Sequence, residues 1–481
     1  MKRAVLLPRP GWAATLPRVA VVGAGISGLA AAHYLRTLGG GAVEVTVYEK
    51  SPRAGGAIVT DLSQGIPLEG GPDSLLVRKT AGVGLVRELG LGDNLMATHP
   101  GARGADIFHE GVLYPIPPGL IAGVPSSPAA LLDSGLLGPQ GKRDLMRGRR
   151  PRPRRAGGDV SLGELLAYHL GPEVVDRIAA PLLSGIYAGD IWQLSARATY
   201  PQLLEWEQRY RSLIAGRAAM PPPPPGPRAP IFMTPRQGLE SVVQALVGAL
   251  SPQIRLNTPV DALVPQGTEF QVHTQSGVDV VDAVVLAVPA TEAARLSAEG
   301  EPAAAALLGT IPYAPLAVVG LVFDPGDIEL PVGKTGALVP KGEELFLTAA
   351  TYVTQKWPYG EEGAVPVRVF YGRSGDDRAV AMSDEDLAAL SLTELARLTP
   401  VPGSPRYVRV FRHRPGMPQY TVGHEERVQA LEKCLGGWPR LRVCGSAFHG
   451  VGVPDCIKDG REQAEALIGQ FAGGSPGIKQ A

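Results

Sequence analysis

The sequence predicts an α/β fold in which a parallel sheet covered by helices is joined to a mixed sheet and to a helical block. Three observations predict it. Near the start of the chain, a β-branched run leads through a glycine-rich turn into an alanine-rich helix. A later apolar run at 283–289 is typical of a strand buried on both faces of a parallel sheet, and 440–445 is expected to be a further apolar strand. The remaining blocks are helical in pattern over 81–216 and strand-rich over 312–412.

The glycine-rich turn predicts a dinucleotide site. A buried strand is expected at 19–22 and a helix from about Ser27 to Leu38. Three glycines between them would allow a tight turn, close approach of the backbone to a pyrophosphate, and close packing of the helix on the strand. These are Gly23, Gly25 and Gly28. The helix N-terminus would face the phosphates, and Glu49, after the strand 44–48, is placed to bind a ribose hydroxyl. The segment therefore predicts a Rossmann-like domain.

This domain is predicted to be discontinuous. A helix after a glycine turn, near 238–246, and a strand–helix pattern over 440–468 continue it. The nucleotide-binding domain is therefore assigned residues 1–80, 230–295 and 438–481. The other assignments are a substrate-binding domain of 81–118 and 296–437, a helical subdomain of 119–216, and a proline-rich connection of 217–229. Within these blocks we expect helices at 83–91 and 162–170 and strands at 312–323, 336–339, 367–371 and 406–412.

Composition limits the partners. The chain has 46 basic and 46 acidic residues, so no overall field recruits nucleic acid. Its three cysteines lack metal or disulfide spacing, which favours a cytoplasmic protein. Prolines interrupt the apolar start of the chain and predict a disordered tail rather than a signal peptide. No run is long enough to cross a bilayer, which leaves peripheral membrane association as the alternative. The arginine-rich stretch 143–155 and the polyproline stretch 220–227 are expected to be surface connections.

The residues after Glu49 narrow the cofactor. The order of Arg53 and the pair Gly55-Gly56, followed by Leu68-Glu-Gly-Gly-Pro-Asp-Ser, resembles the flavin-binding signature of amine oxidases, phytoene desaturases and porphyrinogen oxidases. Arg53 could neutralise pyrophosphate charge, and the paired glycines would let the backbone lie against the cofactor. The resemblance implies FAD and an amine-oxidase-like architecture, with a helical subdomain that faces membranes in relatives.

Further segments resemble the protoporphyrinogen and coproporphyrinogen III oxidases over almost the whole chain. They are 70–74, 181–190, 194–195, 210–214, 417–424 and 450–457. Three others, 118–125, 348–358 and 371–376, look most like the Gram-positive branch, whose members act on coproporphyrinogen III. The implied reaction is a six-electron oxidation of a tetrapyrrole in three flavin turns, with dioxygen as acceptor and hydrogen peroxide as product. The flavin carries this chemistry, so no residue is assigned as catalytic.

The resemblance implies a set of cofactor contacts, in which the N-terminus of the last helix would stabilise negative charge on the reduced flavin. They are Gly23, Ala24, Gly25, Ile26, Ser27, Gly28, Glu49, Lys50, Arg53, Gly55, Gly56, Gly70, Gly71, Pro72, Asp73, Ser74, Val260, His413, Gly445, Gly452, Val453, Pro454 and Asp455. Val260 is expected to contact the adenine through its backbone. At His413 the family often has tryptophan, so the histidine either alters flavin packing or caps a loop. Asp455 is most simply a first-turn carboxylate that favours the helix dipole.

The substrate side is less defined. The protoporphyrinogen-specific enzymes place a propionate-binding arginine near position 105, where this chain has alanine. The candidate substrate residues are Arg78, Lys79, Arg103, Gly185, Thr335, Leu338, Lys356 and Phe370. An isolated surface arginine or lysine is more often simply solvated. Tyr187 and Tyr420 either form an aromatic pair or pack in a core, and His424 and His449 are expected to be structural, with no metal site.

Three alternatives to coproporphyrinogen III oxidation stay open: a protoporphyrinogen IX oxidase, an amine oxidase or desaturase, and a porphyrin-binding flavoprotein without turnover. The sequence does not decide the oligomeric state, and a homodimer is compatible with it.

Overall fold

The computed structural model describes residues 16–148, 150–151, 158–221, 229–359 and 363–473. Four predicted features fall wholly or partly outside these ranges. They are the N-terminal tail, Arg149, the arginines at 152, 154 and 155, and the polyproline residues 222–227.

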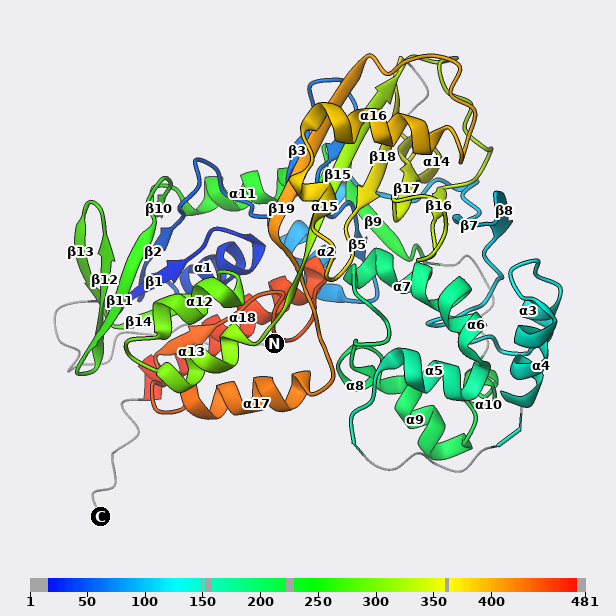
Figure 1. The fold of residues 1–481 in the computed structure, drawn as a ribbon. Coiled ribbons are helices and arrows are strands. Elements are labelled where there is room, and N and C mark those ends of the chain that lie inside the picture. Colours follow the sequence, from blue (N-terminus) through cyan, green and yellow to red (C-terminus); the bar gives the residue numbers. More distant parts are fainter. Residues whose placement is uncertain (1–15, 149, 152–157, 222–228, 360–362, 474–481) are drawn as a thin grey trace.

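Five parallel strands from three separated parts of the chain form the first sheet, in the order β10-β2-β1-β14-β20 (Figure 1). Their bounds are β1 (Arg18–Val22), β2 (Glu44–Tyr48), β10 (Ile254–Arg255), β14 (Ala283–Leu286) and β20 (Leu441–Val443). All neighbouring strands pair in parallel, and β1 is the central strand. The predicted strands near both ends of the chain are thereby confirmed.

Helices cover both faces of this sheet. On one face, buried side chains join the sheet to α1 (Ile26–Gly39), α2 (Thr80–Glu88), α11 (Glu240–Leu250) and α18 (Val453–Gly473). On the other face lie α12 (Ala290–Ser297), α13 (Pro302–Gly309), α17 (His424–Leu435) and the antiparallel strands β11 (Val260–Gln266), β12 (Glu269–Thr274) and β13 (Gly277–Val281). The unbroken apolar runs of β1 and β14 follow from burial on both faces.

The second sheet is mixed, in the order β19-β15-β18-β17-β16-β7-β8. Its strands are β7 (Asp106–His109), β8 (Val112–Pro115), β15 (Tyr313–Phe323), β16 (Gly336–Leu338), β17 (Ala349–Tyr352), β18 (Val365–Tyr371) and β19 (Tyr407–Pro418). Only the β16–β7 pair is parallel. A short helix, α14 (Val353–Lys356), follows β17, and α15 (Arg378–Ala381) and α16 (Asp384–Leu395) pack on the sheet.

Short elements connect the two sheets. They are β3 (Thr60–Asp61), β4 (Leu68–Glu69), β5 (Leu75–Leu76), the 3₁₀ turn η1 (Gly92–Asn94), β6 (Leu95–Ala97) and β9 (Phe232–Pro235). Strands β5, β9 and β6 form a small sheet of their own. This small sheet brings the chain after β4 next to residues 232–235.

The helical subdomain lies beside the mixed sheet (Figure 1). Its helices are α3 (Ala129–Leu132), α4 (Pro139–Gly148), α5 (Leu162–Leu170), α6 (Pro172–Val174), the π-helical turn η2 (Val175–Ala179), α7 (Ala180–Tyr187), α8 (Ala196–Thr199), α9 (Pro201–Tyr210) and α10 (Leu213–Ala218). A capping box between Ser161 and Glu164 begins α5. Over the described ranges, the helices are all too short or too polar to span a bilayer.

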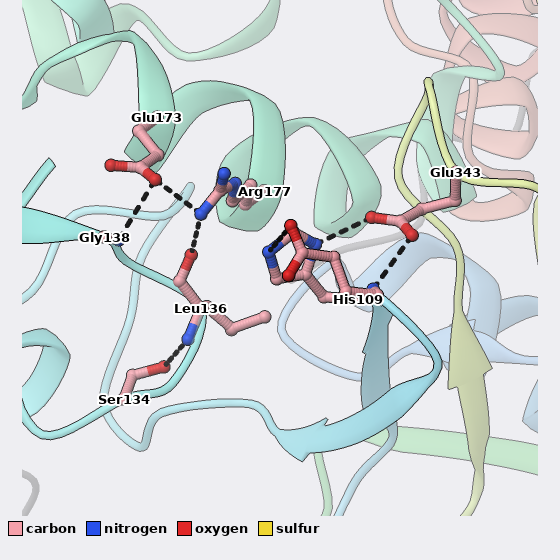
Figure 2. A network of polar contacts seen from close by, with 8 residues as sticks. His109, Ser134, Leu136, Gly138, Glu173, Arg177 and Glu343 are labelled. Carbon is pink, nitrogen blue, oxygen red and sulfur yellow. Dashed lines mark hydrogen bonds and ion pairs between the residues drawn. The ribbon is translucent and has the colours of Figure 1, made fainter.

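Polar contacts line the junction of this subdomain with the mixed sheet (Figure 2). His109 of β7 lies 2.7 Å from an oxygen of Glu343, whose other oxygen accepts from the backbone N–H of Glu110 at 3.0 Å. Across a cavity of about 560 Å³, Arg177 pairs with Glu173. The His109–Glu343 contact therefore lies on the mixed-sheet side of the cavity, and the Arg177–Glu173 pair lies on the side of the helical subdomain.

Candidate active site

The glycine turn after β1 has three distinct constraints. Gly23 has a φ of 102°, and a Cβ there would lie 2.6 Å from the carbonyl oxygen of Ala287. A Cβ at Gly28 would overlap the carbonyl of Gly23, so α1 packs closely on the strand only through glycine. A Cβ at Gly25 would meet no atom of the described residues within 4 Å. Gly25 therefore faces open space at the N-terminus of α1, the position suited to a phosphate group.

Glu49 lies beside this turn. Its side-chain oxygens accept hydrogen bonds from the backbone N–H groups of Ala24 at 2.8 Å and Ser51 at 2.9 Å, and the residue is only 9% exposed. These contacts fix the Glu49 carboxylate at the carboxyl end of β2, next to the glycine turn against which a nucleotide would bind.

The loop after Arg53 runs alongside the glycine turn. The backbone N–H of Gly55 donates to the carbonyl of Ala24 at 2.8 Å. The Arg53 guanidinium donates to the carbonyls of Ile58 at 3.0 Å and Gly56 at 2.7 Å. Arg53 thus shapes this loop in the structure, while its action on a pyrophosphate stays a proposal.

Glu69, a buried residue of β4, joins this strand to Leu239 and Thr60. Its carboxylate accepts from the backbone N–H of Leu239 and the hydroxyl of Thr60, both at 2.7 Å. Burial raises the pKa of Glu69 to about 7, although these two hydrogen bonds oppose the shift. Burial therefore favours the protonated form of this side chain.

Gly70 and Gly71 are required by close packing. A Cβ at Gly70 would overlap the ring of Phe411, and one at Gly71 would overlap the carbonyl of Ala57. His413 lies with its Nε2 atom 2.7 Å from the carbonyl oxygen of Gly70, to which it donates. Burial lowers the pKa of His413, so the ring is neutral at pH 7. Of the two roles expected for this histidine, the structure shows the hydrogen bond to a loop.

Asp73 is bound by two cations. It accepts from Lys356 Nζ at 2.6 Å, and Arg368 Nη1 lies 3.1 Å from the same oxygen. Burial alone would raise the pKa of Asp73, but the charges of Lys356 and Arg368 outweigh it and hold the pKa below its usual range. Ser74 donates to the second carboxylate oxygen at 2.9 Å. Pro72, between Gly71 and Asp73, is half-buried.

The N-terminus of α18 approaches the same region. Asp455, in its first turn, accepts from Lys79 Nζ at 2.6 Å and from the backbone N–H of Gly452 at 3.3 Å. A Cβ at Gly82 of α2 would lie 3.0 Å from Pro454. Asp455 is therefore a first-turn carboxylate, as expected, and it also binds a lysine.

The other predicted cofactor residues differ in their surroundings. Ile26 and Ser27 are buried in the first turn of α1, and a Cβ at Gly445 would lie 3.8 Å from the Ser27 hydroxyl. The carbonyl of Val260 accepts from Arg295 at 2.8 Å, and Lys50 is exposed.

Tyr187 and Tyr420 do not face each other as parallel rings. Their centroids are 6.4 Å apart and the rings are inclined by 52°. Tyr420 is 2% exposed, and its hydroxyl donates to Ser446 and accepts from Gly450 N–H, both at 2.7 Å. Its ring stacks on His424 with 3.9 Å between centroids. Tyr420 therefore packs in the core, which was the simpler of the two hypotheses.

The two histidines have structural surroundings. His424 Nε2 lies 3.2 Å from the carbonyl oxygen of Phe448, and burial lowers the pKa of His424 to about 4. His449 is partly exposed near Glu432, at 3.5 Å. Across the described residues, we find no cluster of three or more histidine, cysteine or acidic groups arranged to hold a metal.

The four candidate cations have different environments. Lys79 and Lys356 are paired with aspartates, and Arg103 is exposed, with its guanidine Nε about 3.1 Å from the Cβ position of Gly333. Arg78 is exposed and has no ion pair within the described part of the chain. Burial raises the pKa of Tyr187 and of Tyr200, and the charge of Arg78 opposes both shifts. Of the four candidates, Arg78 and Arg103 are therefore the exposed cations that make no ion pair with a described residue.

The remaining candidates are spread over the substrate side. Thr335 contributes its backbone to contacts with Gly104 and Tyr352, and Leu338 packs on the helical core. Phe370 lies below the guanidinium of Arg368, and Gly185 is exposed on α7.

Sequence analysis missed Arg368 and Glu69, which are among the most buried charged side chains at this junction. One signal was present for Arg368, since it is the single charge in the apolar strand Val365–Tyr371. Glu69 lies within a segment that was singled out for its glycines.

Comparison with known proteins agrees with this geometry. The family model of flavin-containing amine oxidoreductases matches residues 26–468. The chain belongs to this family of flavin oxidoreductases, and the FAD prediction is thereby confirmed. The open space at Gly25, at the N-terminus of α1 and beside Glu49, fits the phosphate and ribose end of that cofactor.

Individual relatives are similar along their full length. The coproporphyrinogen III oxidase of Bacillus subtilis is 33% identical over 92% of this chain and 96% of its own. That of Staphylococcus aureus is 33% identical over 94% and 99%, and the protoporphyrinogen oxidase of Bos taurus is 29% identical over 94% and 98%. A solved structure from Exiguobacterium sp. 255-15, provisionally named a protoporphyrinogen oxidase, superposes with a TM-score of 0.85 at 33% identity, covering 94% of this chain and 99% of its own. The amine-oxidase-like fold predicted from sequence is thereby confirmed.

Proposed function

We propose that this protein is an FAD-dependent oxidase that converts coproporphyrinogen III into coproporphyrin III. The observation that carries the proposal is similarity over more than nine tenths of both chains to relatives named coproporphyrinogen III oxidase. The glycine turn supports it by offering open space at the N-terminus of α1.

The reaction removes six electrons and six hydrogens from the macrocycle. FAD, when bound, would supply this two-electron redox chemistry, and the six-electron oxidation balances with the reduction of three dioxygen molecules to three molecules of hydrogen peroxide. Residues 23–28 would hold the phosphates, Glu49 the ribose, and the N-terminus of α18 would place its free N–H groups and dipole toward the flavin. The protein needs no general base of its own in this scheme, which agrees with the neutral, hydrogen-bonded His424.

Arg78 is the cation that we propose for a propionate of the substrate. Its charge acts on Tyr187 and Tyr200, whose hydroxyls would be further hydrogen-bond donors for a carboxylate. Lys79 is engaged by Asp455, which leaves Arg78 as the adjacent cation without a protein partner in the described ranges. An arginine also matches the bidentate geometry of a carboxylate better than a lysine does.

The test is direct. Purified yellow protein is mixed with coproporphyrinogen III in air, and porphyrin fluorescence and hydrogen peroxide are followed. We expect both to appear, with three peroxides for each porphyrin. Flavin reduction by an amine without porphyrin formation would instead support an amine oxidase, and bound porphyrin without turnover would support a binding protein.

Protoporphyrinogen IX oxidation is the second candidate, favoured by the similarity to the bovine protoporphyrinogen oxidase. Coproporphyrinogen has four propionates, whereas protoporphyrinogen has two propionates and two vinyl groups. Arg78 could bind a propionate of either substrate, so the preference for coproporphyrinogen III is supported by the similarity to the coproporphyrinogen III oxidases.

We also propose weak peripheral binding to anionic membranes through the arginine-rich segment 143–155, which begins within α4. Of its described arginines, Arg147 pairs with Asp144 at 3.1 Å, and Arg143 donates to Gln140 at 2.7 Å. Each basic residue near an anionic surface contributes about 1 kcal/mol. Flotation with phosphatidylserine vesicles at low salt should recover part of the protein, and its complete absence from the vesicle fraction would exclude this binding.

We propose that the nucleotide-binding domain is discontinuous, as predicted from sequence. The assembly of the parallel sheet from residues 18–48, 254–286 and 441–443 supports this proposal. Helices α2, α13 and α17, which the predicted boundaries assign to the substrate side, also pack on this sheet.

A further inference from the structure

The cluster of Asp73, Lys356 and Arg368 joins the mixed sheet to the segment after β4. Lys356 ends α14, and Arg368 lies in the middle of β18. Both bind one oxygen of Asp73, at 2.6 and 3.1 Å, and Arg368 also donates to the carbonyl of Gly71. Two side chains from one domain therefore hold the backbone and the carboxylate of a segment from the other.

Arg368 is placed unusually for a charged residue. It is 3% exposed, and its guanidinium lies 4.8 Å from the centre of the Phe370 ring. Its Nε atom is buried without a hydrogen-bond acceptor within the described part of the chain. A buried donor without an acceptor destabilises the folded protein. Such a group is a donor left available for a bound molecule.

The held segment borders the proposed cofactor site. Gly71 packs so closely on Ala57 that a Cβ would overlap its carbonyl oxygen. Ala57 follows Gly56, whose Cβ position is 3.2 Å from the Cα atom of Gly25. A shift of residues 71–73 would therefore be transmitted through 56–57 to the open space at Gly25.

The charges favour a positioning role over substrate binding. Both side chains of the Lys356–Asp73 ion pair are largely buried, with 20% of Lys356 and 15% of Asp73 exposed. Pulling Lys356 toward a propionate would leave a partly buried aspartate with a single cation, which is costly. The cluster has two positive charges and one negative charge, so it also favours a nearby anion.

We propose that Arg368 and Lys356 are positioning residues that act through Asp73 and Gly71 to shape the FAD site, and that neither binds a propionate. The proposal rests on the placement of FAD at Gly25 given above.

The test measures FAD affinity by titrating cofactor-free protein and recording flavin fluorescence and the visible spectrum. Arg368→Lys retains the charge but cannot reach both Gly71 and Asp73, and Lys356→Met retains the bulk but loses the charge. We expect each variant to bind FAD about tenfold more weakly, with an altered flavin spectrum. Arg412→Lys is the matched control, because Arg412 of β19 also contacts one aspartate, Asp384, and one carbonyl, that of Met382. Its FAD affinity should stay within twofold of wild type.

A second measurement separates positioning from substrate binding. In Lys356→Met saturated with FAD, the ratio of kcat/KM for coproporphyrinogen III to that for protoporphyrinogen IX should equal the wild-type ratio. A fall in that ratio, or unchanged FAD affinity and spectrum in both variants, would overturn the inference. If Arg368→Lys does not fold by circular dichroism, Lys356→Met decides the outcome. If the wild type oxidises neither porphyrinogen, the proposed function fails, while the FAD titration still tests the inference.

Discussion

Lys79 Nζ lies 2.6 Å from Asp455 Oδ2, and this pair joins the residue before α2 to the first turn of α18. The Lys79 side chain is 43% exposed, so the pair contributes at most about 1 kcal/mol to stability. Its main effect is on charge distribution. It neutralises Lys79 and leaves the neighbouring Arg78 as an unpaired cation within the described residues.

Arg78→Gln should therefore reduce kcat/KM for coproporphyrinogen III by about 10- to 100-fold, since a charge-assisted hydrogen bond is worth about 1.5–3 kcal/mol. Most of the change should be in KM. Arg87→Gln is the matched control, because Arg87 is also exposed and lies in the last turn of α2. Equal kinetics for the two variants would remove Arg78 as an anchor.

Substitutions at Gly25 and Gly28 should have different effects, the first on cofactor binding and the second on protein stability. Gly25→Val places its side chain in open space, so we expect a folded protein whose FAD affinity falls by about 100-fold because of overlap worth about 3 kcal/mol. Gly28→Ala overlaps the Gly23 carbonyl and should lower the thermal stability of cofactor-free protein. Flavin absorbance after purification and thermal unfolding by circular dichroism check both. Normal flavin content in Gly25→Val would contradict the site.

Glu69 should make stability depend on pH. Burial raises the pKa of Glu69 from 4.5 to about 7 in the folded state. The native state therefore retains a proton that the unfolded state loses. This contribution is fully present below pH 4.5 and is lost as pH rises through about 7, and its total is about 3 kcal/mol.

Glu69→Gln mimics the protonated form and removes this dependence. The free energy of unfolding of cofactor-free protein would be measured by urea denaturation between pH 5 and 8 for both proteins. We expect the difference to move in favour of the glutamine variant as pH rises. Parallel curves would show that Glu69 has the same pKa in both states.

Substrate choice should follow the number of propionates. We expect kcat/KM for coproporphyrinogen III to exceed that for protoporphyrinogen IX by about one to two decades, the equivalent of one charge-assisted contact. Both are measured by initial porphyrin fluorescence under identical conditions. A clear preference for protoporphyrinogen IX would favour the second candidate function while leaving the family unchanged.

Local patterns in the sequence were sufficient for the parallel sheet and its turn. The run before Gly23, the helix after it and the position of Glu49 obey short-range rules of strand burial, helix termini and glycine conformation. The long strands of the mixed sheet were predictable for the same reason, because each has its own periodicity. Full-length motif resemblance then indicated the family.

Only the tertiary structure decided which charged residues that are far apart in the sequence form ion pairs. Lys356 and Asp73 are 283 positions apart, and Lys79 and Asp455 are 376 apart, so nothing local predicts that each aspartate neutralises a lysine considered as a substrate anchor. The same holds for Arg368, whose role depends on a carbonyl of a distant segment. A sequence determines which residues carry charge, whereas the free energy of burying and pairing a charge depends on neighbours that only the folded chain brings together.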